Sequence, residues 1–332
     1  MSRLPSVNEK FFSVRAACPV CGSIEVSQIY CCGLTDSPVR DFISSHYEQQ
    51  GKVDWSLLEG TDFVLCACRA CELVYQRNVP GDVVLNSIYN DVISPAFLER
   101  IEAERLTVDN FNQIAGELGV LFRMTGKAPS RIRFLDFGFG RGRWARVARA
   151  MGATVFATET GEEKKAIAAG IGVEIIADQA IDGMRFDIVH TEQVFEHLTD
   201  PATHFRRLAA VTDGIMKVAV PQHGDIGALL ARKGMTSVSP FNDRLLKRRR
   251  LTGEDHDYVA IQPLEHLNAY ARKTIDVLAA ANGMRVVSRT RVGSVAVDVG
   301  RLANSAVRVG AMLAKRFRAD TGYYLLRPGS GR

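Results

Sequence analysis

The chain has 332 residues, of which 46% are hydrophobic and 24% are charged. Such a length and composition fit a globular protein with one large domain or two modest ones, and exclude a disordered, collagen-like or coiled-coil protein. The 42 basic and 37 acidic residues give a net charge of +5, which is far below the charge density of a dedicated nucleic-acid-binding protein. This charge permits an anionic substrate without requiring one.

The seven cysteines all lie between Cys18 and Cys71. The sequence starts without the apolar core of a signal peptide and contains no run of about 18 apolar residues. We therefore expect a cytoplasmic protein with reduced thiols and no transmembrane segment. Clustered thiols in that compartment indicate a metal site rather than a disulfide scaffold.

Two C-x2-C pairs, Cys18 with Cys21 and Cys68 with Cys71, can offer four thiolates to one tetrahedral ion. A closed shell of four thiolates leaves no open coordination position, so the ion would be structural. We expect zinc in a zinc-ribbon-like module at residues 1–80.

The other three cysteines, Cys31, Cys32 and Cys66, compete for the role of ligand. Cys66 and Cys68 are separated by a single residue, which is closer than the two-residue spacing usual for a pair of zinc ligands. Cys68 paired with Cys71 has the usual spacing and is therefore preferred. Buried free thiols, a redox motif and a nucleic-acid-binding ribbon are the alternative interpretations. The redox motif lacks a surrounding βαβ pattern, and basic residues do not cluster near the pairs.

Helical spacing of apolar residues follows in two regions. Residues 39–47 have this spacing inside the segment that separates the two cysteine pairs. Residues 81–125 are also expected to be helical, with one apolar stripe over 111–122. We expect residues 81–130 to form a helical linker or cap.

A glycine-rich turn comes next, between the predicted strand 132–135 and a predicted helix at 144–151. Its sequence is Asp136-Phe-Gly138-Phe-Gly140-Arg-Gly142. Strand, glycine turn and helix in this order bring backbone close to a ligand at the carboxyl edge of a sheet. The spacing differs from the dinucleotide fingerprint, and the ending of a P-loop is absent.

Two acidic residues refine the ligand that this turn would bind. Asp136 lies directly before the glycines. Its carboxylate would repel the negative charge of a pyrophosphate and attract a cationic amino-acid group. Glu159 ends the next predicted strand, 154–158, where a carboxylate can accept both ribose hydroxyls. The alternatives are a solvated turn acid for Asp136 and a helix N-terminal charge for Glu159.

The run 131–221 resembles the class I S-adenosylmethionine-dependent methyltransferases. The glycine turn matches the first motif of that family, and Glu159 matches its ribose-binding acid. Phe186-Asp-Ile-Val, followed by Glu196-His-Leu-Thr-Asp-Pro, matches the signature of its fourth strand. The resemblance implies an α/β fold, a doubly wound seven-stranded Rossmann-like sheet at residues 131–332, with S-adenosyl-L-methionine as cofactor.

The same resemblance implies three further cofactor contacts and one strand. Asp178 follows the third strand, where the family contacts adenine, and Thr191 and Glu192 lie just beyond the fourth strand, along the cofactor pocket. Residues 322–327 resemble the antiparallel seventh strand of the family.

The cysteine pairs, with the Leu-Val-Tyr-Gln that follows them and a later Leu-x-x-x-Tyr at residues 85–89, are similar to the zinc-binding domain of some small-molecule methyltransferases, including deoxysugar C-methyltransferases. Glu265-His266 matches a pair that those enzymes associate with proton abstraction, in which the carboxylate raises the basicity of the imidazole. Two features depart from that pattern: Pro263 replaces a tyrosine, and the chain is too short for their additional C-terminal domain.

Three histidines are candidate bases for an acceptor that must lose a proton. His197 belongs to the Glu-His-x-x-Asp-Pro turn and is expected to orient that loop. His223 follows the predicted fifth strand, 214–221, near the edge of the cofactor site. Glu265 and His266 could instead form a hydrogen-bond network at the entry of a helix.

Two basic segments are left outside these motifs. An insertion at about 222–262 contains the basic run 246–250 and the acidic cluster 254–257. We expect a solvated loop, with contact to a phosphorylated or nucleotide-linked substrate as the alternative. Residues 303–317 predict a packed helix rather than a helix on a membrane surface.

These features together predict methyl transfer to a small-molecule acceptor, with a sugar or nucleotide-sugar as the leading class. One alternative is a non-catalytic cofactor-binding subunit. The other is an RNA methyltransferase that uses the zinc module for substrate contact, although the cysteine module is not basic and the sequence lacks a base-methylation tetrad. The sequence does not specify the acceptor atom or the oligomeric state.

Overall fold

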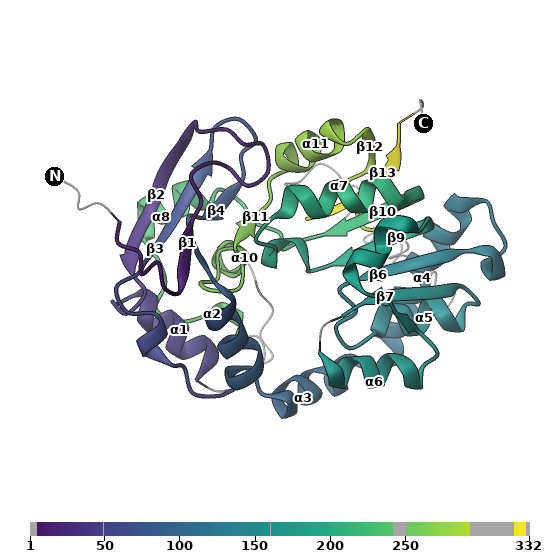
Figure 1. Cartoon of the computed structure of the whole chain (residues 1–332), viewed down its shortest axis with the longest axis horizontal. Helices are drawn as coiled ribbons and strands as arrows, with labels where there is room; N and C mark the ends of the chain where they lie inside the picture. Colours follow the sequence, from purple (N-terminus) through teal and green to yellow (C-terminus); the bar gives the residue numbers. More distant parts are fainter. Residues whose placement is uncertain are drawn as a thin grey trace, which may run out of the picture. The chain divides into compact units, whose positions relative to one another are not determined.

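The computed structural model describes residues 5–48, 50–159, 161–241, 251, 253–292 and 322–329. The chain forms two compact units that interleave along the sequence (Figure 1). The cysteine unit comprises Met1–Glu104, Phe195–Ala202 and Val220–Leu278, and the sheet unit comprises Arg105–Val194, Thr203–Ala219 and Ala279–Arg332. Compactness thus divides the chain differently from the boundaries at residues 80 and 130, which mark changes of motif.

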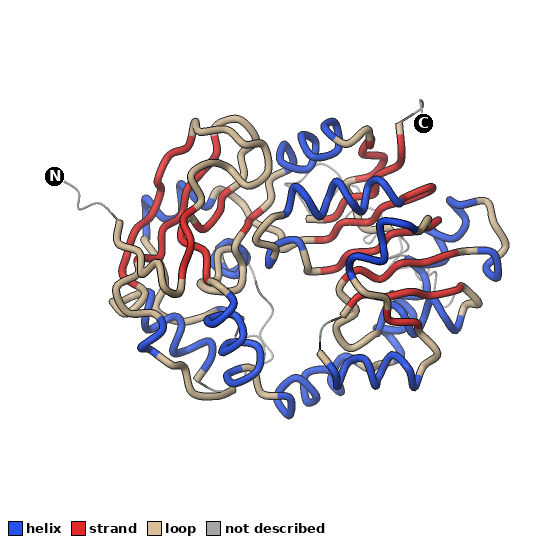
Figure 2. The backbone as a smooth tube through the Cα atoms, viewed as in Figure 1, coloured by secondary structure: helices blue, strands red, loops and turns tan. Residues whose placement is uncertain are grey.

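The sheet unit is built on seven strands in the order β12-β13-β10-β9-β6-β7-β8. Figure 2 shows strands in red and helices in blue. The strands are β6 (Arg133–Phe137), β7 (Thr154–Thr158), β8 (Glu174–Ile175), β9 (Phe186–Glu192), β10 (Thr212–Ala219), β12 (Met284–Ser288) and β13 (Tyr323–Pro328). β13 is antiparallel to both β10 and β12, while β10, β9, β6, β7 and β8 are parallel. The predicted seven-stranded sheet and its antiparallel last strand are confirmed.

Two phenylalanines of β6 show how both faces of this sheet are covered. Side chains of a strand point alternately to its two faces, so residues three apart lie on opposite faces. Phe134 belongs to the apolar core that α4 (Val108–Thr125) and α5 (Arg143–Ala150) form. Phe137 contacts the His204 ring of α7 (Pro201–Val211), with 5.9 Å between the ring centroids. Because strand order reverses between β6 and β9, a ligand is expected at the carboxyl ends of these strands.

Among the described residues, α6 (Glu162–Gly170) connects β7 to β8 and the short η4 (Asp178–Gly183) connects β8 to β9. The short η3 (Pro129–Arg131) leads from α4 into β6. The sequence passes from the cysteine unit to the sheet unit within α11 (Arg272–Ala281), after Leu278.

The predicted helical region 81–125 is interrupted. It contains α2 (Asp82–Asn86), η2 (Ser87–Val92), α3 (Pro95–Arg105) and α4. Ile93 is extended and ends η2. Pro95 disfavours helical backbone at Ser94, directly before it, so the helix does not continue. Thr107 is extended as well, and its side chain accepts a hydrogen bond from the Asn110 amide to cap α4.

The cysteine unit contains two antiparallel sheets. β1 (Phe12–Val14) pairs with β5 (Asn78–Pro80), and the second sheet has the order β11-β4-β3-β2. Its strands are β2 (Val26–Gly33), β3 (Asp62–Cys68), β4 (Val74–Gln76) and β11 (Asn268–Ala269). α1 (Val39–Tyr47) packs its apolar face into the core of this unit, as its spacing predicts.

The expected loop at residues 222–262 contains two helices, so the expectation of a solvated loop is wrong for its described part. α8 (Ile226–Lys233) and α10 (Asp255–Ala260) contribute to the core of the cysteine unit. The Glu254 carboxylate accepts hydrogen bonds from Arg232 and Lys233, which joins the acidic cluster to α8. The basic run 246–250 and the helix predicted at 303–317 lie outside the described residues.

Among the described residues, no helix is both long enough and apolar enough to cross a membrane.

Candidate functional site

The glycine turn joins the end of β6 to the start of α5 in the sheet unit. Gly138, Gly140 and Gly142 have φ values of 84°, 56° and 74°, in the left-handed region that favours glycine. A Cβ at Gly138 would collide with Val194, and one at Gly142 with the Phe139 ring. A Cβ at Gly140 would have no heavy atom within 4 Å. The backbone at Gly140 is therefore open to close approach by a ligand.

Glu159 lies against this turn, directly after β7. Its Oε2 accepts a hydrogen bond from the Gly140 amide at 3.1 Å, and its Oε1 accepts from the Gly161 amide at 3.2 Å and from Lys164 Nζ at 3.3 Å. The carboxylate is thus held at the turn, as expected for a residue that contacts the same ligand as the glycines.

Asp136 is 3% exposed, so it is not a solvated turn acid. Its Oδ1 lies 2.7 Å from His190 Nδ1, and its carboxylate accepts a hydrogen bond from the Ala145 amide in the first turn of α5. Burial raises the pKa of Asp136 to about 8, although the nearby Lys217 cation opposes this rise. Asp136 therefore connects β6, β9 and the start of α5.

The three other predicted cofactor residues have partners within the sheet unit. Asp178, at the start of η4, pairs with Arg207 at 2.5 Å. The Thr191 hydroxyl donates to the Lys217 carbonyl at 3.1 Å, and Glu192 accepts from the Lys217 side chain at 2.5 Å. Their contacts with a cofactor remain predictions.

The cysteine unit brings together the four thiols that the sequence favours. Cys18 and Cys71 Sγ are 3.6 Å apart, Cys21 and Cys68 Sγ are 3.5 Å apart, and all four lie within 4.8 Å of one another. Four sulfurs at about 2.3 Å from a tetrahedral zinc ion would be separated by about 3.8 Å. The cluster therefore has the dimensions of a zinc site.

Backbone amides surround the cysteine cluster as well. The Val20 and Cys21 amides donate to Cys18 Sγ, and the Leu73 amide donates to Cys71 Sγ. Gly22 has a φ of 71°, which allows the tight turn after Cys21. Such hydrogen bonds favour thiolates, the form in which cysteine binds a metal.

A histidine cluster forms a third candidate site, also within the cysteine unit. One ligand-type atom each of Glu196, His197 and His266 lies within 4.8 Å of the others. His266 Nδ1 is 2.6 Å from the Val259 carbonyl and must donate its proton there. The other ring nitrogen, Nε2, therefore carries a lone pair. Burial lowers the pKa of His266 to about 4, so the ring is neutral near pH 7.

The expected effect of Glu265 on His266 is not found. The Glu265 carboxylate accepts hydrogen bonds from the Tyr47 hydroxyl at 2.7 Å and from Gln262 Nε2 at 2.8 Å. The His266 ring donates to a backbone carbonyl instead, and its pKa is lowered rather than raised. The expectation that this carboxylate increases the basicity of the imidazole is thus wrong.

Two site residues were not identified from the sequence, and one candidate base lies apart. Tyr89 OH is 3.3 Å from His197 Nδ1, and Tyr47 supports Glu265 from α1. Tyr89 ends the Leu-x-x-x-Tyr pattern at residues 85–89 but has no predicted role in the site, and Tyr47 belongs to no motif. The fold brings both tyrosines to the cluster. His223 follows β10, with Nδ1 2.8 Å from the Gly224 carbonyl, and is not a member of the histidine cluster.

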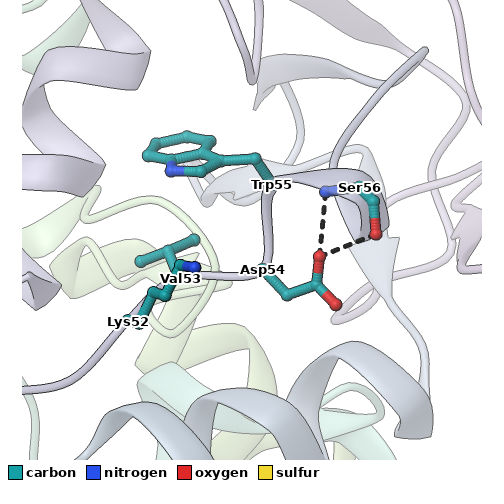
Figure 3. A pocket seen from close by; sticks show the side chains of 5 residues that line it. All are labelled: Lys52, Val53, Asp54, Trp55 and Ser56. Atoms are coloured by element: carbon teal, nitrogen blue, oxygen red, sulfur yellow. Dashed lines mark hydrogen bonds between the residues drawn. The ribbon is translucent and has the colours of Figure 1, made fainter.

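A surface pocket of the cysteine unit is lined by five consecutive residues, Lys52 to Ser56 (Figure 3). Asp54 accepts hydrogen bonds there from the amide and the hydroxyl of Ser56 and so begins the short helix Trp55–Leu57. The pocket contains none of the predicted site residues.

Comparison with known proteins identifies one family. The family described as "Methyltransferase domain" matches residues 106–289. A search of curated proteins found no match.

Several solved structures are similar at low identity. The plantazolicin methyltransferase BpumL in complex with SAH is 14% identical, with a TM-score of 0.44 over 74% of this chain and 93% of that one. A putative methyltransferase from Bacillus halodurans C-125 is 18% identical, with a TM-score of 0.35 over 52% and 70%. The mitomycin 7-O-methyltransferase MmcR is 14% identical, with a TM-score of 0.41 over 66% and 54%. These similarities are too distant to indicate a substrate.

The buried histidines predict acid-sensitive folding. His46 is 3% exposed, and burial lowers its pKa to about 3. A histidine whose pKa is lower in the folded state than in the unfolded state binds its proton more readily when the protein unfolds. Its contribution to stability is therefore complete above pH 6.5 and is lost as the pH falls. We expect each such histidine to reduce the free energy of unfolding by about 1.4 kcal/mol per pH unit below pH 6.5.

Urea unfolding of wild type and His46→Asn between pH 7 and pH 5 tests this expectation. The variant should have a shallower dependence on pH. Ser239→Ala, which removes the hydroxyl that lies 2.7 Å from His46 Nδ1, should change stability while keeping the wild-type slope. Equal slopes for His46→Asn and wild type would contradict the assignment.

Proposed function

The chain belongs to the methyltransferase-domain family and is an S-adenosylmethionine-dependent methyltransferase; on this basis we propose that it methylates a small-molecule acceptor. We place the cofactor at the glycine turn. The observation that carries this placement is the open backbone at Gly140, with the Glu159 carboxylate 3.1 Å from its amide. When bound, S-adenosylmethionine supplies a methyl group activated by its sulfonium.

The residues around the turn have distinct proposed roles. The Glu159 carboxylate accepts hydrogen bonds from the ribose hydroxyls. The Gly140 and Gly161 amides donate to this carboxylate and fix its orientation. Asp136 accepts a hydrogen bond from the cationic amino group at the amino-acid end of the cofactor, and that nearby positive charge would lower the raised pKa of Asp136 and favour its ionised form. Asp178 contacts the adenine, and Thr191 and Glu192 border the pocket.

We propose a sugar or nucleotide-sugar as the acceptor. The support is the combination of a four-cysteine module with a Glu265-His266 pair, which together resemble the deoxysugar enzymes. The basic composition of the chain is compatible with an anionic or nucleotide-linked acceptor.

We further propose that His266 accepts a proton from the acceptor. Donation from Nδ1 to the Val259 carbonyl fixes the tautomer and orients the ring, which leaves Nε2 as the accepting atom. Glu265 acts on the surroundings of this histidine through Tyr47 and Gln262 rather than through the ring itself. His223 remains the second candidate for the base.

The four-cysteine cluster is proposed to hold a structural zinc ion. All four ligands come from the protein, so such an ion would stabilise the fold of the cysteine unit rather than take part in the reaction.

Binding of S-adenosylhomocysteine measured by calorimetry tests the cofactor site. Glu159→Gln should weaken binding roughly tenfold to a hundredfold, because a charged acceptor for two hydroxyls becomes neutral. Asp136→Asn should weaken binding as well. The control is Glu174→Gln, an exposed residue at the start of β8. Wild-type affinity in both site variants would refute the proposed pocket.

Metal analysis of the purified protein should give about one zinc per chain. Cys18→Ser and Cys68→Ser should each lower the zinc content and the stability, since each removes one of four thiolates. Cys31→Ser alters an exposed thiol outside the cluster and should retain the metal. A fully folded wild-type protein without metal would exclude the zinc site.

A panel of sugar nucleotides should reveal turnover that depends on His266. His266→Asn should reduce kcat by about 10²- to 10⁴-fold, which is the usual contribution of a general base, while S-adenosylhomocysteine still binds. His223→Asn is the competing variant, and His256→Asn is the control. Full turnover by His266→Asn with loss of turnover in His223→Asn would transfer the role to His223.

A further inference from the structure

A buried lysine lies at the centre of the seven-stranded sheet. Lys217 of β10 is fully buried, and its Nζ lies 2.7 Å from Glu117 Oε1, 2.5 Å from Glu192 Oε2 and 3.0 Å from His190 Nε2. It also lies 3.6 Å from the centre of the Trp144 ring. An ammonium group has three N–H donors and no acceptor. The two carboxylates and the imidazole therefore use all three donors.

This donor count fixes the tautomer of His190. Because Lys217 donates to Nε2, that nitrogen must be the acceptor and the ring proton must be on Nδ1. Nδ1 is 2.7 Å from Asp136 Oδ1 and donates to it. The ring is neutral, since burial and the lysine charge lower the pKa of His190 well below its usual range. Hydrogen bonds thus run in one direction, from Lys217 through His190 to Asp136.

The strand register produces this alignment. Asp136 of β6 is paired with His190 of β9, and His190 is paired with Lys217 of β10. The three residues are consecutive cross-strand neighbours. Their strands, β6, β9 and β10, are adjacent in the sheet (Figure 1). Their order places the lysine two strands away from β6, the strand that leads into the glycine turn, with β9 between them.

The end of the chain of hydrogen bonds is the start of α5. Asp136 accepts from the Ala145 amide in the first turn of this helix, and the glycine turn lies between the two residues. The orientation of the Asp136 carboxylate is therefore coupled to the conformation of the turn that we propose to bind the cofactor.

We propose that Lys217 and His190 are positioning residues for cofactor binding: they orient the Asp136 carboxylate and, through the Ala145 amide, hold the glycine turn ready for S-adenosylmethionine. This inference rests on the proposed cofactor site. Neither residue needs to touch the cofactor, because each acts through Asp136.

Two substitutions at His190 test the inference while retaining the lysine and both of its carboxylate partners. In His190→Asn, the amide nitrogen can take the place of Nδ1 and still donate to Asp136. In His190→Phe, a ring of similar size has no donor. S-adenosylhomocysteine should bind His190→Asn within about threefold of wild type and His190→Phe roughly tenfold or more weakly. Circular dichroism and thermal unfolding establish whether each variant is folded.

Nitrogen-15 NMR of histidine-labelled protein reports which ring nitrogen of His190 carries the proton. The inference requires one particular tautomer, whereas a purely structural role does not. The signals that are absent from the His190→Asn spectrum belong to His190, and they should be those of a neutral ring protonated at Nδ1. An Nε2-protonated ring or an imidazolium would overturn the inference.

Glu159→Gln separates this inference from the proposed pocket. If wild type binds S-adenosylhomocysteine, Glu159→Gln does not, and His190→Phe binds as wild type does, the positioning role fails while the pocket stands. If wild type itself does not bind, the proposed pocket fails. Equal weakening in His190→Asn and His190→Phe would also overturn the inference, because the donor to Asp136 would then be irrelevant.

Discussion

The alignment of β6, β9 and β10 is the constraint on which the sheet unit depends. Parallel pairing aligns the three strands side by side, and the residues that meet toward their carboxyl ends are an aspartate, a histidine and a lysine. Removing these groups from water is costly, and their burial is compatible with a stable fold only because each polar atom has a partner. A shift of one residue in any of the three strands would separate the partners and turn their side chains to the other face.

Much of the fold could be predicted from local patterns. The glycine turn depends on residues that are consecutive in the chain, and its left-handed backbone requires glycine at Gly138 and Gly142 for steric reasons that the sequence itself implies. The four-cysteine set was predictable for a related reason, since two short C-x2-C pairs place their thiols on tight turns. In both cases a few neighbouring residues determine the local geometry.

Contacts between distant segments could not be predicted in this way. Lys217 lies within the apolar run 215–220, where a lysine signals a buried partner without revealing which one. Its partner His190 follows from strand register, which tertiary packing sets. Glu265 and His266 are adjacent in sequence, yet their side chains bind different groups, so adjacency gave the wrong partner. Tyr89 belongs to a local pattern, but its contact with His197 depends on tertiary packing.

The interleaving of the two units has a consequence for how this architecture can change in evolution. β11, from residues 268–269, completes a sheet whose other strands all precede residue 77, and α8 and α10 share a core with α1. Loss or exchange of the N-terminal hundred residues by recombination would remove the partners of segments that lie far downstream. The cysteine-containing segment and these downstream segments must therefore be inherited together, although the clustering of the cysteines in the sequence predicts a separate N-terminal module.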